Sequence, residues 1–201
     1  MNFFKFLCCL FCIGFCTLTA QEESKAPSKK YTTLEIESAN APSIDGNLDD
    51  SIWASVEWGS DFIEVNPDEN TEPSVQTKFK ILYDQKHLYI ALKALDPEPE
   101  TITNRLSRRD GFVGDRINVL IDSYHDLRTG FLFTVTAAGV RGDEFITDNG
   151  DNIDESWNPI WSTKALIDDE GWSAEMKIPL SQLRFSNDQN QVWGLNVARN
   201  Y

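Results

Sequence analysis

After residue 16 the sequence contains no cysteine, and this absence limits what can hold the fold together. All four cysteines lie within the first sixteen residues. The rest of the chain therefore has no disulfide, no thiolate metal site and no cysteine nucleophile. A domain without these supports depends on its hydrophobic core, and about 180 residues are enough to build one.

Positively charged side chains are also scarce. Eighteen Lys and Arg residues stand against 32 Asp and Glu residues, and the formal net charge is −14 at pH 7. A surface of this charge repels nucleic acid and anionic lipid, whereas it is compatible with neutral ligands and with cations. The sequence therefore predicts no nucleic-acid partner.

Short motifs that carry chemistry are missing too. The chain has no Gly-x-Ser-x-Gly, no Walker-type loop and no His-Glu-x-x-His. Its two histidines, His87 and His125, have no spaced partner for a zinc site. Glycoside hydrolysis needs two facing carboxyl groups, and among 32 acids no pair stands out. We therefore expect no catalytic residue in this chain.

The first twenty residues have the pattern of a secretory signal peptide. Lys5 precedes the apolar run Phe6–Phe15, and a small residue, Ala20, stands at a cleavage point before Gln21. The run is too short for a membrane span. We expect export to the periplasm, to the outer membrane or out of the cell. Residues 21–31, rich in charge with Ser and Pro, are predicted to be a linker.

Alternation of apolar and polar residues predicts a series of short strands after this linker. The clearest is Arg116–Asp122, where Ile117, Val119 and Ile121 share one face and a mostly polar set that includes Asn118 shares the other. Further strands are predicted at 32–37, 62–65, 78–83, 88–94, 131–136, 141–147, 162–167, 172–178 and 192–200, with helical turns at 48–54 and 179–183.

Many short strands with regular turn signals favour an all-β fold. We predict one antiparallel β-sandwich of jelly-roll type over residues 32–201. The last strand stops at Tyr201 without a turn after it, so we expect the chain to be a fragment of a longer protein.

Five motifs in order make the chain similar to a known family. They are Ile44–Asp49 with Trp53, Lys80–Asp84 with Leu88–Ala91, Asp115–Asp122, Gly171–Pro179, and Trp193–Arg199. Together they resemble the family 9 carbohydrate-binding module, within the DOMON-like sandwich group, over roughly Leu34 to Arg199. With Arg108–Asp110 and Leu183–Phe185 added, the chain looks most like the module at the N-terminus of large bacterial envelope proteins, in which a C-terminal barrel-like region follows.

The resemblance implies a jelly-roll sandwich that binds oligo- or polysaccharide between two aromatic side chains. A sugar ring stacks its C–H face on an aromatic ring, and its hydroxyls need fixed polar partners. Phe112 stands at the position of the first clamp aromatic. Asn118 replaces the family's carboxylate and Thr134 its basic residue, while the second aromatic would lie beyond Tyr201. Arg109 is expected to assist.

The tryptophans leave two roles open. Trp53, Trp172 and Trp193 are predicted to be core residues because each shares a face with apolar neighbours. Trp157 and Trp161 stand at loop edges, where they either line the sugar site or pack the acidic loop that follows residue 147.

This acidic loop is also a candidate calcium site. Asp148, Asp151 and Asp154 supply the oxygen density that Ca²⁺ requires, although their spacing differs from that of a twelve-residue calcium loop. The resemblance adds weight, since some members of the family carry structural calcium. The alternative is a solvated turn without metal.

We therefore interpret the chain as an exported, non-catalytic carbohydrate-binding module and as the N-terminal part of a larger envelope protein linked to glycan binding or breakdown. Family members can be attached to glycoside hydrolases, so enzymatic activity would belong to another part of the protein. The alternative is a structural or assembly domain that has lost its sugar contacts and docks on a missing C-terminal region.

Overall fold

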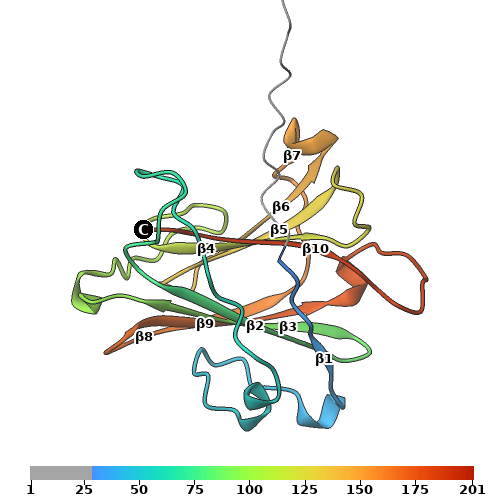
Figure 1. Cartoon of the computed structure of the whole chain (residues 1–201), viewed down its shortest axis with the longest axis horizontal. Coiled ribbons are helices and arrows are strands. Elements are labelled where there is room, and N and C mark those ends of the chain that lie inside the picture. The colour runs from blue at the N-terminus through green and yellow to red at the C-terminus, as the bar shows by residue number, and fades with distance from the viewer. Residues whose placement is uncertain (1–28) are drawn as a thin grey trace, which may run out of the picture. The chain divides into compact units, whose positions relative to one another are not determined.

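Two five-stranded sheets face each other in the computed structural model, which describes residues 29–201 (Figure 1). The first sheet, here called the back sheet, has the strand order β1-β2-β3-β9-β8. The second, the front sheet, has the order β10-β4-β5-β6-β7. All neighbouring strands are antiparallel except β1 and β2, which are parallel. The predicted antiparallel β-sandwich is confirmed.

The strands are short and separated by turns. Their bounds are β1 Leu34–Glu35, β2 Thr77–Tyr83, β3 His87–Leu95, β4 Arg116–Asp122, β5 Gly130–Thr136, β6 Arg141–Thr147, β7 Asn152–Asp154, β8 Ser162–Asp168, β9 Gly171–Pro179 and β10 Gly194–Asn200. Short 3-10 turns occur at Ser38–Asn40, Ser51–Ser55, Pro99–Thr101, Asp148–Gly150 and Leu180–Gln182. No helix in this part of the chain has the length and apolarity that a membrane crossing requires.

Residues 31–201 form one compact unit. The predicted signal peptide, residues 1–20, lies outside the described residues, and so does most of the predicted linker.

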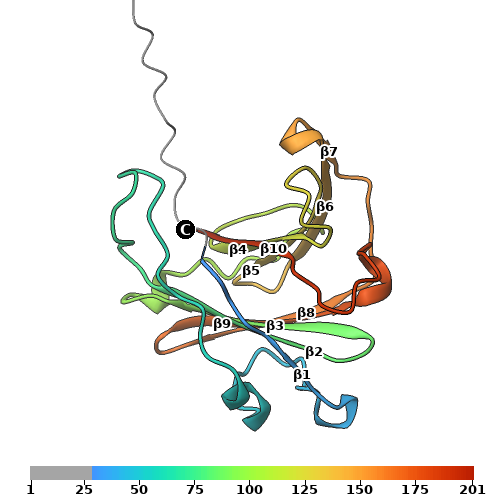
Figure 2. The ribbon, with the colours of Figure 1, turned by 45° about the vertical axis from the view of Figure 1, so that its right-hand side comes forward.

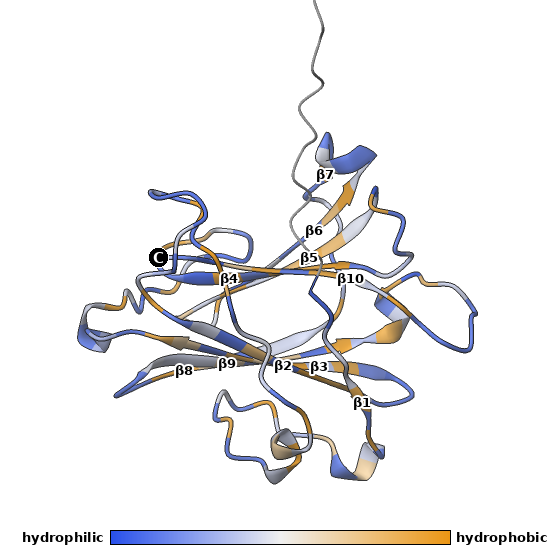
Figure 3. Ribbon diagram, viewed as in Figure 1, coloured by the Kyte–Doolittle hydropathy of each residue, from blue (hydrophilic) through white to orange (hydrophobic). Residues whose placement is uncertain are grey.

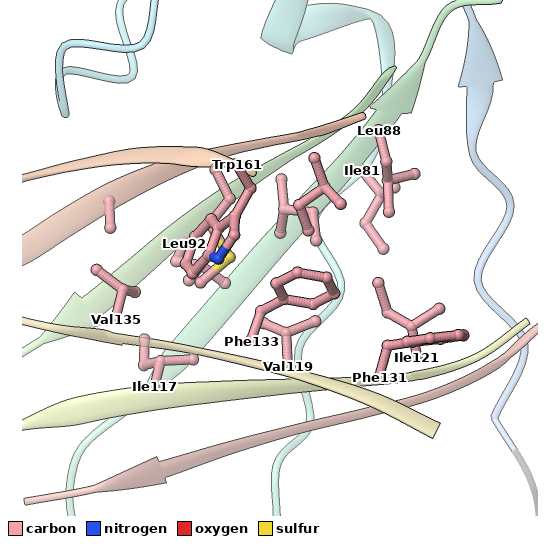
Figure 4. Packing of buried hydrophobic residues seen from close by; sticks show 14 of the residues in the cluster. Ile81, Leu88, Leu92, Ile117, Val119, Ile121, Phe131, Phe133, Val135 and Trp161 are labelled. Atoms are coloured by element: carbon pink, nitrogen blue, oxygen red, sulfur yellow. The ribbon is translucent and has the colours of Figure 1, made fainter. Parts of the chain in front are cut away.

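The main core lies between the two sheets and follows from the alternation along the strands (Figure 3). Ile117, Val119 and Ile121 of β4 are at most 2% exposed. Trp172 and Met176 of β9 are fully buried on the opposite sheet, as their pattern predicts. Apolar side chains of the two layers point toward one another, as Figure 4 shows for those of β4 and β5 facing β3.

A second apolar cluster covers part of the outer face of the back sheet. Trp53 packs there with Ile36, Leu82, Tyr89 and Ala91. The segment that brings Trp53, residues 36–56, runs beneath the back sheet (Figure 2). Trp53 is only 3% exposed, so its predicted burial is confirmed, but it plugs this outer cluster rather than the main core.

Two segments differ from prediction. Residues 62–65 form no strand and make a single bridge between Glu64 and Thr71, because Pro67 follows at once and has no N–H for a ladder. Within the predicted acidic loop, the short strand β7 pairs with β6. Its three residues are all exposed, and so short a segment carries no periodic signal that separates a strand from a loop.

Candidate functional site

The outer face of the front sheet gathers the polar side chains of three neighbouring strands. Asn118 of β4 lies opposite Thr134 of β5, which in turn lies opposite Gly142 of β6. Because Ile117 and Val119 point into the core, the residues between and beside them point outward. This outer surface of β4, β5 and β6 is called the front face below.

Phe112 reaches the front face from the loop before β4. A Cβ atom at position 142 would collide with Cζ of the Phe112 ring, so the ring occupies the space that Gly142 leaves empty. The guanidinium carbon of Arg116 lies 5.7 Å from the ring centroid, within the distance of a cation–π contact. Phe112 and Asn118, which the sequence places six residues apart, are thus brought to the same surface.

The polar side chains of this surface hold one another in place. The Thr134 hydroxyl donates a hydrogen bond to Asn118 Oδ1 at 2.9 Å, and Asn118 Nδ2 donates to Asn200 Oδ1 at 2.9 Å. Thr134 is almost fully buried, whereas Asn118 is partly exposed. An amide nitrogen carries two hydrogens, so Asn118 keeps one N–H for a ligand in an orientation that its neighbours fix.

Arg109 lies elsewhere and already has partners. Its guanidinium donates to Asp143 Oδ1 and, at 3.1 Å, to the carbonyl oxygen of Pro159. Asp143 pairs with Phe133 across the strands, so its carboxylate is on the core side of β6 and not on the front face. The structure therefore does not bring Arg109 together with Asn118.

The two loop-edge tryptophans are packed on the core side. Trp161 is 3% exposed, meets Phe133 edge to face at a centroid distance of 5.2 Å, and donates its indole N–H to Asp143 at 2.8 Å. Trp157 packs on Phe131 at 5.1 Å and on Phe133 at 5.6 Å. Of the two roles that the sequence leaves open, the structure places both residues in packing positions.

The acidic turn does not gather a ligand set for calcium. Asp148, Asp151 and Asp154 are all exposed, and the described residues contain no group of three metal-ligating side chains. Asp154 Oδ1 instead accepts hydrogen bonds from the Ser156 hydroxyl at 2.5 Å and from its backbone N–H at 2.9 Å. These bonds lower the pKa of Asp154. The three residues do not fit a calcium site in this arrangement.

A sequence profile described as carbohydrate family 9 binding domain-like matches residues 44–201. The chain belongs to this family. The match includes both sheets from β2 onward and all of the front face, so the predicted resemblance is confirmed. Among curated proteins, none matches the chain at a significant level.

Solved structures with the same fold include other family 9 modules. A carbohydrate-binding module of family 9 from Caldicellulosiruptor kristjanssonii, in complex with glucose, has 20% sequence identity and a TM-score of 0.58, over 84% of this chain and 76% of that one. Its complex with cellotriose gives the same identity and TM-score, over 84% and 75%. A putative carbohydrate-binding protein from Bacteroides uniformis has 14% identity and a TM-score of 0.60, over 85% and 83%.

Two residues on the front face of this family 9 module, Gly142 and Glu144, were not among the site residues predicted from the sequence. Gly142 is essential to the seat of Phe112, but the contact joins residues thirty positions apart and leaves no local pattern. Glu144 shares the outward parity of Gly142, and alternation along β6 is the signal that finds it. Partial burial, together with the charges of Glu155, Asp110 and Asp143, raises the pKa of Glu144.

Proposed function

We propose that this family 9 module binds carbohydrate on its front face, with Phe112 as the stacking surface. The observation that carries the proposal is the position of the Phe112 ring, seated over Gly142 beside the ordered Asn118–Thr134 pair. Family membership and the sugar-bound complexes of the module from Caldicellulosiruptor kristjanssonii support a sugar as the ligand.

The front face offers both kinds of contact that a pyranose needs. The apolar C–H face of a sugar ring packs on an aromatic ring, and this contact excludes water from both. The free N–H of Asn118 donates to a hydroxyl, while the Glu144 carboxylate accepts from one. Arg116, whose guanidinium lies over the Phe112 ring, adds further donors beside it. All of these contacts are non-covalent and none breaks a bond of the sugar, so the proposed role is binding without catalysis.

We further propose that the module is exported and works as part of a larger envelope protein. The signal-peptide pattern of residues 1–20 supports export. A tethered binding module keeps its neighbouring region close to glycan, because linkage turns a second binding event into an intramolecular one. Weak sugar affinity is sufficient for such a role.

Isothermal titration with glucose and cellotriose tests sugar binding at this face. We expect saturable binding by the wild type, roughly tenfold weaker binding by Phe112→Ala and a smaller loss in Asn118→Ala, since the ring supplies the larger contact. Leu166→Ala is the matched control, because Leu166 is exposed on the back sheet, and it should bind as the wild type does.

The absence of heat up to about 10 mM of either sugar would reject the proposal, since that concentration is near the limit of a weak site. The domain would then be better described as a structural or assembly domain. Equal binding by the wild type and Phe112→Ala would reject the front face as the site while leaving sugar binding intact.

A further inference from the structure

A hollow of about 430 Å³ lies on the outer face of the back sheet, opposite the front face. This volume falls within the range of small-molecule pockets, roughly 300–1,000 Å³. It is lined by residues of the covering segment, of the segment beside β2, of β2, β3, β8 and β9, and of the turn between β8 and β9. They include Asp49, Trp58, Lys78, Lys93, Asp168 and Ser173. The feature is called the back hollow here.

The floor of the back hollow is a cross-strand row that the covering segment leaves open. Lys78 lies opposite Lys93, which lies opposite Ser173, and all three point away from the main core. In the next row, Glu175 and Lys80 are buried, Glu175 beneath residues 45–53. The back hollow therefore begins where segment 36–56 stops covering the sheet.

Lys93 and Ser173 of the back hollow are held in place before any ligand arrives. Lys93 Nζ lies 2.6 Å from Asp168 Oδ2 and 3.3 Å from Glu170 Oε2, and its side chain is mostly buried. The Ser173 hydroxyl donates to the carbonyl oxygen of Gly46 at 2.7 Å. Groups fixed in this way lose little conformational entropy when a ligand binds, which favours binding.

Trp58 supplies an aromatic surface at one side of the hollow. Its side chain is among the exposed large apolar ones, at 38%. Lys80 Nζ lies 4.8 Å from the centroid of its ring and donates to the Trp53 carbonyl oxygen at 2.5 Å. Lys80 does not line the hollow, and its ammonium group covers one face of the indole. Exposed tryptophan beside fixed polar groups is the chemistry of a sugar site.

Lys78 leaves a donor free at the floor. No hydrogen bond or ion pair is found for its ammonium group within residues 29–201, whereas Lys93 beside it is neutralised. The lining has a net negative charge, because it contains two ammonium groups and three carboxylates, those of Asp49, Asp168 and Glu170. This balance favours a neutral sugar over a uronic acid.

We infer that the back hollow is a second carbohydrate-binding site, which takes one neutral sugar unit of an oligosaccharide. The sugar ring stacks on Trp58 while its hydroxyls accept from Lys78 and donate to the carboxylates of Asp168 and Asp49. This site goes beyond the front-face function and does not depend on Phe112. Two sites on opposite sheets allow one module to contact two glycan chains.

Fluorine NMR of protein labelled with 5-fluorotryptophan tests this site directly. The Trp58 resonance is assigned as the one missing from Trp58→Phe, and glucose, xylose and cellotriose are each added up to about 10 mM. We expect this resonance to shift saturably with at least one of the three sugars, equally in the wild type and in Phe112→Ala. A shift of the Trp58 resonance that persists in Phe112→Ala shows that this site is separate from the front face.

Two further variants define the site. Lys78→Met removes the free ammonium without touching the indole and should weaken the Trp58 response roughly tenfold. Leu166→Ala is the matched control, since Leu166 lies opposite Ser173 in the same row but outside the hollow, and should leave the response unchanged. A Trp58 resonance that stays still with all three sugars, or that stops responding in Phe112→Ala, overturns the inference.

Discussion

Substitution of Glu175 by alanine should release the covering segment from the back sheet. Glu175 is fully buried in β9, on the outer side of the back sheet. Its Oε1 accepts the indole N–H of Trp53 at 3.0 Å, and its Oε2 accepts the backbone N–H groups of Asp45 and Gly46, each at 3.0 Å. One carboxylate therefore ties residues 45–53 to the sheet.

The size of the effect follows from the donors that would be left without an acceptor. In Glu175→Ala the Trp53 and Gly46 N–H groups remain buried, and each unsatisfied donor costs about 1–3 kcal/mol. The exposed Asp45 can turn to water. Removing a buried charge returns part of its desolvation cost, so we expect a net loss of about 3 kcal/mol in the free energy of unfolding.

Urea unfolding followed by circular dichroism measures this loss. The slope of the unfolding free energy against urea concentration should stay unchanged, which would show that the unfolded state is the same. Glu69→Ala, a change of an exposed acid, is the control and should stay within about 0.5 kcal/mol of the wild type. A loss of less than about 1 kcal/mol in Glu175→Ala would refute the reasoning, since it would mean that water replaces the carboxylate.

Glu175 should also make the free energy of unfolding depend on pH. Burial is the main cause that raises the pKa of Glu175 in the folded state. A raised pKa means that the folded state favours the protonated carboxyl. Its contribution to stability is therefore complete below the ordinary carboxyl pKa and declines as pH rises through the folded value. The unfolding free energy of the wild type minus that of Glu175→Gln should therefore fall as the pH rises through that window. A difference that rises with pH would contradict this assignment.

Three other perturbations have defined outcomes. Gly142→Ala should push the Phe112 ring off the front face and weaken cellotriose binding about tenfold in titration calorimetry; unchanged affinity would place the sugar elsewhere. Although burial of Asp84 opposes its ionisation, four hydrogen bonds outweigh burial and lower the pKa to about 2. Asp84 therefore adds about 2 kcal/mol above pH 3.8, which should disappear as pH falls toward 2 in urea titrations and stay absent in Asp84→Asn. Excess EGTA should lower the melting temperature by less than about 1 °C. A larger fall would indicate that the turn of Asp148 and Asp154 binds calcium after all.

Much of the fold could be predicted from the sequence because burial on one side of a strand leaves a visible period of two. Trp172, Ala174 and Met176 of β9 were assigned to the core on this basis and are fully buried. The alternate residues of the same strand, Ser173 and Glu175, are buried as well. Their burial depends on a segment more than a hundred residues earlier, so no local pattern could indicate it.

The candidate site was predictable to a similar extent. The family resemblance placed Phe112, Asn118 and Thr134 together, alternation placed Asn118 on the outward face, and the structure brings these three to one surface. Arg109 and Trp161 could not be placed in this way, because both are fixed by the inward carboxylate of a distant strand. Long-range polar pairing of this kind has no signature in a single sequence.

Chemical-shift mapping with ¹⁵N-labelled protein and cellotriose tests most directly whether the front face binds sugar. In the Trp58→Phe variant, which removes the indole of the back hollow, we expect saturable shifts of the Asn118, Thr134 and Gly142 amides and none in β8 or β9. Shifts confined to the back sheet, or the absence of any shift at about 10 mM cellotriose, would contradict it.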